Sequence, residues 1–342
     1  MRSSLAQKRV PLSGSIELTY RCNLRCQHCY ISHGHTGIPG KEELSLSEIR
    51  NVFDQIVAQD CLWLLLTGGE PLMRRDFLDI YKYAKRVGLL VTLFTNGTMV
   101  TPEIADFLAE YRPFNLEITL YGRTQETYER VTGIPGSHAR CMRGIDLLME
   151  RGVPLTLKTM VMTLNKHELW DMKDFARSLD VEFRYDPMIN AGANGSGKPL
   201  SMRISPEEIL QFDLQDPGRV EKLKQFQDNQ SKINRDDRFL YVCGAGIYSF
   251  HIDPYGQLSV CIMAREPGYD LRSGTFEVGW RDFLSDVRYQ APEGEYLCAE
   301  CELLPICGQC PGWAQMEHGD QQKPVSYLCQ VAHKRAEAFK IN

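Results

Sequence analysis

Short apolar runs alternate with amphipathic segments from residue 15 to residue 187. The runs have the length and the β-branched and aromatic content of buried strands. They lie at 15–20, 62–67, 89–95, 114–121, 154–163 and 181–187. The segments between them have the apolar spacing of helices. These are 45–59, 75–88, 101–111, 140–152 and 166–179. Strands that alternate with helices form parallel sheets, so we predict an α/β fold, a partial (β/α)6 barrel like a TIM barrel with fewer units.

The pattern changes after residue 187. Residues 188–204 are rich in Gly, Ser, Asn and Pro, which is typical of a linker or a mobile loop. A charged helical bridge follows at about 205–238. From residue 240 the periodicity weakens, apart from one hairpin at 248–261 and helices near 280–288 and 326–339. We predict four parts: an N-terminal segment (1–14), the barrel (15–187), a linker and helical bridge (188–239) and a loop-rich, cysteine-rich domain (240–342).

Charge and hydropathy exclude several classes of protein. The net charge is −5, and no run of Lys and Arg indicates a nucleic-acid partner. The longest apolar run, 61–66, is far too short to span a bilayer. The N-terminus lacks the apolar core of a signal peptide. We therefore expect a cytoplasmic protein with no nucleic-acid or membrane partner.

The chain has twelve cysteines, a high number for a cytoplasmic protein. Disulfides are disfavoured there, so metal binding is the better expectation. Three cysteines lie within residues 22–29 and seven between residues 243 and 329. Cys61 and Cys141 stand apart in apolar surroundings, where a thiol usually serves as a small core side chain.

Cys22, Cys26 and Cys29 follow the first predicted strand, at the barrel end where catalytic residues gather. A tetrahedral zinc site would need a fourth ligand. The candidates are His28, His33 and His35. An iron–sulfur cluster usually takes four thiolates, so a cluster held by three has one iron open to a ligand. The spacing alone leaves zinc and cluster both open.

Small and polar residues end the next three strands. Gly68 and Gly69 allow the backbone to come close to a ligand, and Glu70 offers an acceptor for an ammonium group. Asn96 suits a sugar hydroxyl or an amide, and Thr119 follows at the end of the fourth strand. Each is also compatible with an ordinary turn. Together they predict a binding site on one rim of the barrel.

This combination resembles the radical S-adenosylmethionine (SAM) superfamily. The resemblance covers about residues 15–187: the Cys-x3-Cys-x2-Cys loop, the aromatic Tyr30 after it, and the Gly-Gly-Glu-Pro run at 68–71. It implies a 4Fe–4S cluster on the three cysteines whose open iron binds SAM. One electron then cleaves SAM to a 5′-deoxyadenosyl radical, which abstracts hydrogen from a substrate. The implied cofactor-binding residues are Tyr30, Gly68, Gly69, Glu70, Asn96 and Thr119.

The seven C-terminal cysteines do not have the spacing of a zinc ribbon. A ribbon needs two Cys-x2-Cys pairs about 15–20 residues apart. Here five residues separate the pair Cys298 and Cys301 from the pair Cys307 and Cys310. Seven thiols also exceed the needs of one tetrahedral ion.

The order of these cysteines resembles the SPASM extension, which holds auxiliary 4Fe–4S clusters in a subset of radical SAM enzymes. The resemblance implies two auxiliary clusters. The distal one would use Cys298, Cys301, Cys307 and Cys329, and the nearer one Cys243, Cys261 and Cys310. Some members have a further cysteine where this chain has Asp237. Asp237 is thus either a fourth ligand or a solvated surface charge.

The resemblance to SPASM enzymes implies a peptide substrate, in which the enzyme installs a crosslink or an oxidative modification, as in the maturation of ribosomally synthesised peptides. Ile262 follows Cys261 where anaerobic sulfatase maturases have an aspartate base, which argues against that activity. Because the first predicted strand begins at residue 15, we expect leader recognition by a separate small PqqD-like protein. Flavodoxin or ferredoxin is the expected electron donor. The alternatives are action on a small molecule or tetrapyrrole, as in haem-type cofactor biosynthesis, and a zinc-stabilised binding protein without catalysis.

Overall fold

The computed structural model describes residues 9–31, 38, 40–231, 239–304 and 306–339. Its centre is one open sheet of nine strands in the order β6-β5-β4-β3-β2-β1-β7-β8-β9. The strands are β1 (Ser13–Glu17), β2 (Trp63–Thr67), β3 (Leu90–Thr95), β4 (Asn115–Thr119), β5 (Leu155–Met160), β6 (Glu182–Asp186), β7 (Ser249–Ile252), β8 (Gln257–Ser259) and β9 (Tyr269–Asp270). Strands β1–β7 are parallel, whereas β8 and β9 are antiparallel to their neighbours.

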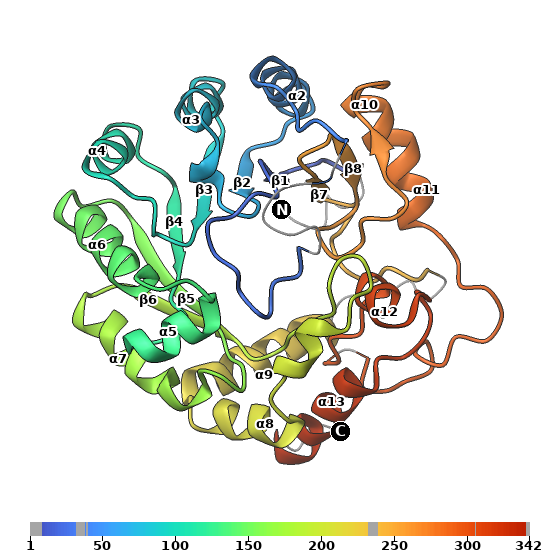
Figure 1. The fold of residues 1–342 in the computed structure, drawn as a ribbon. Coiled ribbons are helices and arrows are strands. Elements are labelled where there is room, and N and C mark those ends of the chain that lie inside the picture. Colours follow the sequence, from blue (N-terminus) through green and yellow to red (C-terminus); the bar gives the residue numbers. More distant parts are fainter. Residues whose placement is uncertain (1–8, 32–37, 39, 232–238, 305, 340–342) are drawn as a thin grey trace.

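Helices form the outer layer of the barrel region (Figure 1). They are α2 (Leu46–Ala58), α3 (Phe77–Arg86), α4 (Pro102–Glu110), α5 (Gln125–Thr132), α6 (Ser137–Glu150) and α7 (Leu169–Ser178). The later helices are α8 (Pro206–Leu214), α9 (Pro217–Ser231), α10 (Phe276–Val278), α11 (Leu284–Arg288), α12 (Pro311–His318) and α13 (Ser326–Phe339). A π-helical turn at Gly279–Phe283 joins α10 to α11, and 3-10 turns lie at Pro71–Met73, Lys166–Glu168 and Lys198–Met202. The predicted α/β class is confirmed, and the sheet does not close into a complete barrel.

The two faces of the sheet differ in chemistry. The side chains that face the helices are apolar and buried, for example Leu66, Leu93 and Leu157. They pack with Ile56 and Tyr81 of the helices in one hydrophobic core. Cys61 and Cys141 are buried in the same core, as expected. The opposite, concave face carries charged residues, so the polar chemistry of the molecule gathers inside the curve of the sheet.

Local sequence signals explain the helix starts. Ser45 and Glu48 form a reciprocal capping box at the start of α2. Thr101 accepts a hydrogen bond from the backbone N–H of Ile104 at the start of α4 (3.3 Å), with Pro102 in the first turn. These caps fix the residues at which α2 and α4 begin.

The predicted hairpin is present, but its place was not foreseen. Its first strand, β7, pairs in parallel with β1, from Ser13↔Ser249 to Ile16↔Ile252, and so extends the barrel sheet. Pairing between segments this far apart has no local sequence signal. Helices α5 and α12 were also missed, because threonines form half of the buried face of α5 and α12 begins with Pro311 and Gly312.

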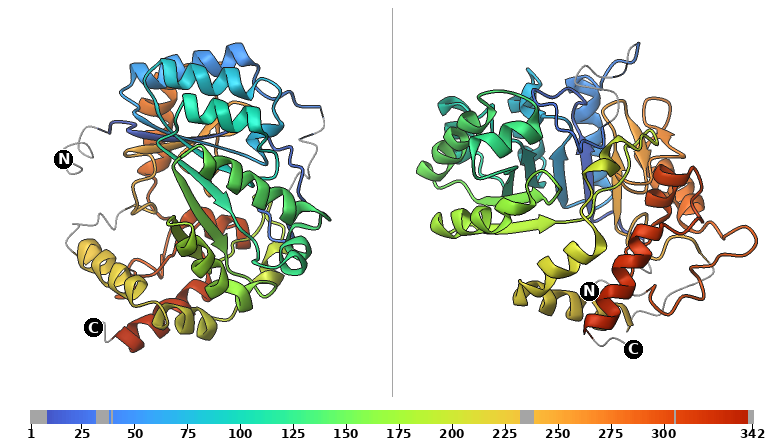
Figure 2. Two further views of the ribbon diagram at one scale, coloured as in Figure 1. Left: turned by 90° about the vertical axis from the view of Figure 1, so that its left-hand side faces the viewer. Right: turned by 60° about the horizontal axis from the view of Figure 1, so that its bottom comes forward.

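The C-terminal helix returns to the bridge helices. Figure 2 shows α13 beside α8, where the buried Arg335 donates to Asp213 (2.8 Å). The predicted divisions of the chain at residues 187 and 239 stay predictions. None of the helices in the described residues is both long and apolar enough to cross a bilayer.

Candidate active site

Cys22, Cys26 and Cys29, the first thiol group, lie in the loop that follows β1 at its carboxyl end. Burial raises the pKa of Cys22 to about 12, and the nearby charge of Cys29 adds to the effect. Burial also raises the pKa of Cys26, helped by Cys29 and Cys22. The three sulfurs are therefore close enough to repel one another as thiolates.

The seven C-terminal cysteines fall into two further groups. Cys243, Cys261 and Cys310 form the near thiol group, because burial first and then the charges of Cys261 and Cys243 raise the pKa of Cys310, to about 11. The distal thiol group is Cys298, Cys301, Cys307 and Cys329. There, burial and the other three thiols raise the pKa of Cys307 to about 11. The thiols within each group therefore lie near enough for their charges to interact, and their roles as cluster ligands stay predictions.

This donor chemistry fits iron–sulfur clusters. Thiols that are buried and repel one another need nearby positive charge to become thiolates, and bound iron supplies it. Within the described residues, no three His, Cys, Asp or Glu side chains converge as ligands of a single ion. In a four-iron cluster each cysteine binds a different iron, so its ligands need not converge on one point. His33, His35 and Asp237 lie outside the described residues.

Gly68 and Gly69 allow the loop after β2 to press on the chain that leads into Cys22. A Cβ atom on Gly68, whose φ is +138°, would lie 2.3 Å from the carbonyl oxygen of Thr19. One on Gly69 would lie 2.3 Å from the carbonyl oxygen of Arg21. Their backbones are joined by Gly69 N–H to Thr19 O (2.7 Å) and Glu70 N–H to Arg21 O (2.9 Å). The close approach that the sequence assigned to a ligand is here an approach to the protein's own backbone.

Glu70 is fully buried between the ends of β2 and β3. Its carboxylate accepts hydrogen bonds from the Thr95 hydroxyl (2.8 Å) and from the backbone N–H groups of Asn96 (2.8 Å) and Leu72 (3.1 Å). Burial raises its pKa to about 7, although these hydrogen bonds oppose the shift. Glu70 therefore fastens two strand ends together, and its interaction with an ammonium group stays a prediction.

Asn96 connects the end of β3 to the loop of the first thiol group. Its amide donates to Asn23 Oδ1 (2.9 Å), and Asn23 donates in turn to the Thr98 hydroxyl (2.7 Å). The same amide nitrogen lies 3.9 Å from Cys22 Sγ. Thr119, the last residue of β4, pairs with Lys158 of β5 and is partly buried. Asn96 thus lies beside Cys22 of the first thiol group, whereas the binding of SAM by Asn96 and Thr119 stays a prediction.

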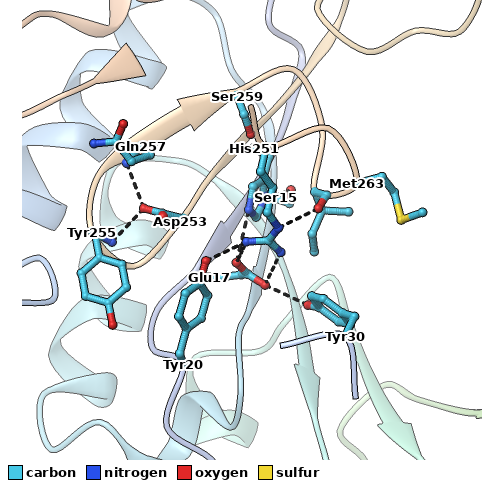
Figure 3. Close-up of polar contacts among 12 residues, drawn as sticks. Ser15, Glu17, Tyr20, Tyr30, His251, Asp253, Tyr255, Gln257, Ser259 and Met263 are labelled. Carbon is cyan, nitrogen blue, oxygen red and sulfur yellow. Dashed lines mark hydrogen bonds and ion pairs between the residues drawn. The ribbon is translucent and has the colours of Figure 1, made fainter. Parts of the chain in front are cut away.

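A buried polar network, which the sequence analysis did not predict, is centred on Glu17 of β1 (Figure 3). Arg265 donates two hydrogen bonds to its carboxylate, at 2.7 and 3.0 Å. The hydroxyl of Tyr30 donates to Glu17 Oε1 (2.8 Å), and His251 Nε2 lies 3.3 Å from Glu17 Oε2. Arg265 also donates to the Tyr20 hydroxyl (2.7 Å). We call these five residues the Glu17 network.

The Glu17 network joins two cysteine regions. Burial alone would raise the pKa of Glu17, but the charge of Arg265 and the contact with His251 outweigh it and lower the pKa. Tyr30 directly follows Cys29, and Arg265 lies four residues after Cys261. The carboxylate therefore holds the loop of the first thiol group against the loop after β8. The only local signal was a charged residue inside the apolar run at 15–20.

Two further contacts surround the first thiol group. The Tyr121 side chain interacts with Cys26, and its ring meets the His28 ring edge-on at 5.1 Å. The backbone N–H of Ala193 donates to the carbonyl of Tyr30 (2.8 Å). The Gly- and Ser-rich segment 188–204 therefore touches the cysteine loop, a position that the sequence did not indicate.

Comparison with known proteins agrees with this geometry. Residues 16–176 match the family model described as Radical SAM superfamily. The chain is 33% identical to the AdoMet-dependent heme synthase of Methanosarcina barkeri, over 94% of this chain and 97% of that protein. The chain belongs to the radical SAM superfamily. It is also 29% identical to the mycofactocin maturase MftC of Mycobacterium ulcerans, over 88% of this chain and 83% of that protein.

The fold resembles that of Streptococcus suis SuiB bound to its precursor peptide SuiA. The TM-score is 0.73 at 15% identity, over 96% of this chain and 78% of that chain. Membership of the radical SAM superfamily makes this chain an enzyme that uses SAM and a 4Fe–4S cluster. The SPASM assignment, the number of auxiliary clusters and the individual ligands stay predictions.

Proposed function

We propose that this radical SAM enzyme modifies a ribosomally synthesised peptide, with Cys22, Cys26 and Cys29 as the ligands of its SAM-binding cluster. The observation that carries the proposal is the first thiol group: three partly buried cysteines in the loop at the carboxyl end of β1, with Asn96 beside Cys22. When bound, the cluster and SAM supply the 5′-deoxyadenosyl radical that abstracts hydrogen from the substrate.

The protein's own residues have positioning roles in this proposal. The Asn23, Asn96 and Thr98 hydrogen bonds fasten the cysteine loop to β3, and Gly68 and Gly69 fit the loop after β2 beneath it. Tyr121 and the Glu17 network enclose the loop and limit the access of water. A preorganised, closed site of this kind protects a reactive species from the solvent.

The near and distal thiol groups are proposed to hold two auxiliary 4Fe–4S clusters. Three thiols in one group and four in the other match one partly and one fully ligated cluster. Asp237, water or the substrate would then complete the near cluster. Such clusters accept the electron that a substrate radical must lose to become a closed-shell product, and ligation tunes their potentials. A PqqD-like protein for the leader and flavodoxin or ferredoxin as electron donor complete the proposal.

The similar proteins favour different substrates. The likeness to the mycofactocin maturase and to SuiB supports a precursor peptide. The likeness to the heme synthase, at 33% identity over almost the whole chain, supports a tetrapyrrole as the second candidate. Ile262 in place of a base and the three separate thiol groups give no support to a sulfatase maturase or a zinc-stabilised binding protein.

The test compares the two substrates directly. Reduced, cluster-loaded protein is incubated with SAM and with either a precursor peptide encoded beside its gene or a propionate-bearing tetrapyrrole. Mass spectrometry then follows both substrates. We expect a mass change in the peptide and none in the tetrapyrrole. A change in the tetrapyrrole alone would replace the first candidate by the second.

A further inference from the structure

The concave face of the sheet carries a row of polar residues at one level. Lys158 of β5 pairs with Thr119 of β4 on one side and with Arg184 of β6 on the other. Register partners in a parallel sheet point to the same face. We call Thr119, Lys158 and Arg184 the cationic row. It crosses three strands on the side of the sheet away from the helices.

One carboxylate forms ion pairs with both cations of the row. Lys158 Nζ lies 3.2 Å from Glu117 Oε2, and Arg184 donates to the same oxygen at 2.7 Å. Glu117 is buried, and with Lys158 protonated these three groups carry a net charge of +1 inside the sheet's curve. A guanidinium has five N–H donors and an ammonium three. Within the described part of the chain, Glu117 is the carboxylate that pairs with either of them.

The surroundings of Lys158 make a second anion favourable. Its side chain is 19% exposed, and its ammonium group lies over the ring of Phe94. Burial lowers its pKa to about 7, Glu117 opposes the shift, and the charge of Arg184 adds to it. Arg184 is 53% exposed and extends the row into the open interior. A buried cation that its own counter-ion compensates incompletely is stabilised by a further negative charge.

The row lies on the interior side of the barrel sheet. Thr119 is the last residue of β4 and pairs with Lys158 of β5. Tyr121, two residues after Thr119, interacts with Cys26 of the first thiol group. A group bound by the row would therefore lie on the barrel's interior, on the side of β4 and β5.

We propose that Lys158 and Arg184 form a subsite that binds a carboxylate of the substrate. The fork of a guanidinium matches the two oxygens of a carboxylate, and charge-assisted hydrogen bonds of this kind are strong. The inference rests on the function proposed above and names the chemistry of its substrate. The carboxylate belongs either to an acidic residue or C-terminus of a peptide, or to a propionate of a tetrapyrrole.

Asp186 provides an internal check on this charge argument. It is the next residue of β6 on the same face, pairs with Met160 and accepts a hydrogen bond from the backbone N–H of Met188 (2.9 Å). As an anion it opposes a bound carboxylate. Removing its charge with Asp186→Asn is expected to strengthen carboxylate binding.

The experiment measures dissociation constants of two matched pairs of probes on the cluster-loaded, SAM-bound holoenzyme. One pair is a propionate-bearing porphyrin and its methyl ester. The other is a peptide with one glutamate and the same peptide with glutamine. We expect the acid of one pair to bind more tightly than its neutral partner by about tenfold or more. Lys158→Met or Arg184→Gln should remove that difference. The pair that shows the effect identifies the source of the carboxylate.

A control and a pH profile separate binding from a structural role. Arg177→Gln, which removes an exposed charge of α7 paired with Asp174 (2.9 Å), is expected to leave both affinities unchanged. Acid binding is expected to weaken above about pH 7 as Lys158 loses its proton, with Glu117 and Arg184 as the charged groups that act on it. Should Lys158→Met fail to fold, the half-exposed Arg184→Gln carries the test.

Equal affinity for acid and neutral probes, or unchanged acid affinity in both variants, would overturn the subsite. The proposed function is tested separately by the 5′-deoxyadenosine that wild-type protein forms from SAM without any substrate. If that product forms and acid binding shows no preference, the subsite alone is wrong. If acid binding follows the prediction and no 5′-deoxyadenosine forms, the proposed function is wrong.

Discussion

The first and the distal thiol groups are held in different ways. The loop of the first thiol group is fastened by side chains from several strands: Asn96 from the end of β3, Glu17 from β1 and Arg265 from the loop after β8. The distal thiol group lies mostly in residues 289–310. Within the described part of that segment there are turns but no helix or strand, and Cys301 is exposed.

This difference indicates which of the two sites the polypeptide forms before a cofactor binds. Buried hydrogen bonds and a bidentate ion pair fix the first loop before any cofactor binds. The distal loop has short backbone turns such as Cys307 N–H to Leu303 O (2.8 Å), and Gln309 ties it to Val325 (3.0 Å). We infer that the barrel positions the first cluster, whereas bound iron orders the distal loop.

Of the changes considered, iron removal is expected to have the largest effect. It should affect the protease sensitivity of the two regions differently. Chelation under reducing conditions should make residues 289–310 sensitive to proteolysis. Where a loop has little other scaffold, the free energy of metal binding supplies the free energy of folding. The barrel strands should stay protected. Limited proteolysis with mass spectrometry measures both. Equal protection of both regions after iron removal would show that the distal loop needs no metal.

Glu17→Gln tests the ion pair with Arg265 that helps to hold the loop of the first thiol group. The substitution leaves the Arg265 cation buried without its carboxylate, and breaking such a pair costs about 3–5 kcal/mol in the free energy of unfolding. Chemical denaturation of the barrel measures the loss. The exposed pair of Arg177 and Asp174 is the matched control, and Arg177→Ala should cost under about 1 kcal/mol. Similar values for the two variants would refute the special role of the network.

Glu70 makes the barrel's stability depend on pH. Burial raises its pKa to about 7 in the folded protein, so the folded state holds this proton more tightly than the unfolded chain does. The contribution to stability is complete below the ordinary carboxyl pKa and is lost as the pH rises through about 7. The loss is on the order of 3 kcal/mol.

The pH effect is read from the difference between wild type and Glu70→Gln in denaturation curves at several pH values. Other titrating groups cancel in that difference. We expect the wild type to lose stability relative to the variant from about pH 5 to pH 8. Parallel pH profiles would show that Glu70 is not protonated in the folded state at neutral pH.

The smallest effect is expected from removing the side-chain hydrogen bonds of Gln309 in the distal loop. Gln309→Ala removes the hydrogen bonds to Val325 N–H and to the carbonyl of Lys323, at a cost of about 1–3 kcal/mol. The proposed distal cluster would hold the loop in iron-loaded protein, so proteolysis of 289–310 should increase only slightly. A collapse of the distal loop despite full iron loading would mean that the scaffold, and not the metal, orders this region.

The sequence predicted the regular half of the molecule because its signals are local. Apolar runs and helical spacing located β1–β6 and the helices α2, α3, α4, α6 and α7 within a few residues. The loop of the first thiol group was recognisable for the same reason, since three cysteines lie within eight residues. The tail cysteines were grouped through their resemblance to a family and not through periodicity.

The long-range features could not be predicted from local patterns. Glu17 and Arg265 meet only because β7 pairs with β1, which joins segments more than 200 residues apart. The cationic row likewise depends on the register of β4, β5 and β6. A charged residue within an apolar strand, such as Glu17 or Lys158, was a local signal that the sequence analysis did not use. Its partner was fixed by the topology.

The most direct test of the central claim is the amount of 5′-deoxyadenosine formed from SAM by anaerobically prepared, cluster-loaded protein under a strong reductant. Wild type and Cys29→Ala are measured side by side, with the iron content of each determined. We predict that wild-type protein forms 5′-deoxyadenosine and that Cys29→Ala forms none while retaining the iron of the C-terminal thiol groups. No product from iron-loaded wild type, or equal product from both proteins, would contradict the assignment of a SAM-cleaving cluster to the first thiol group.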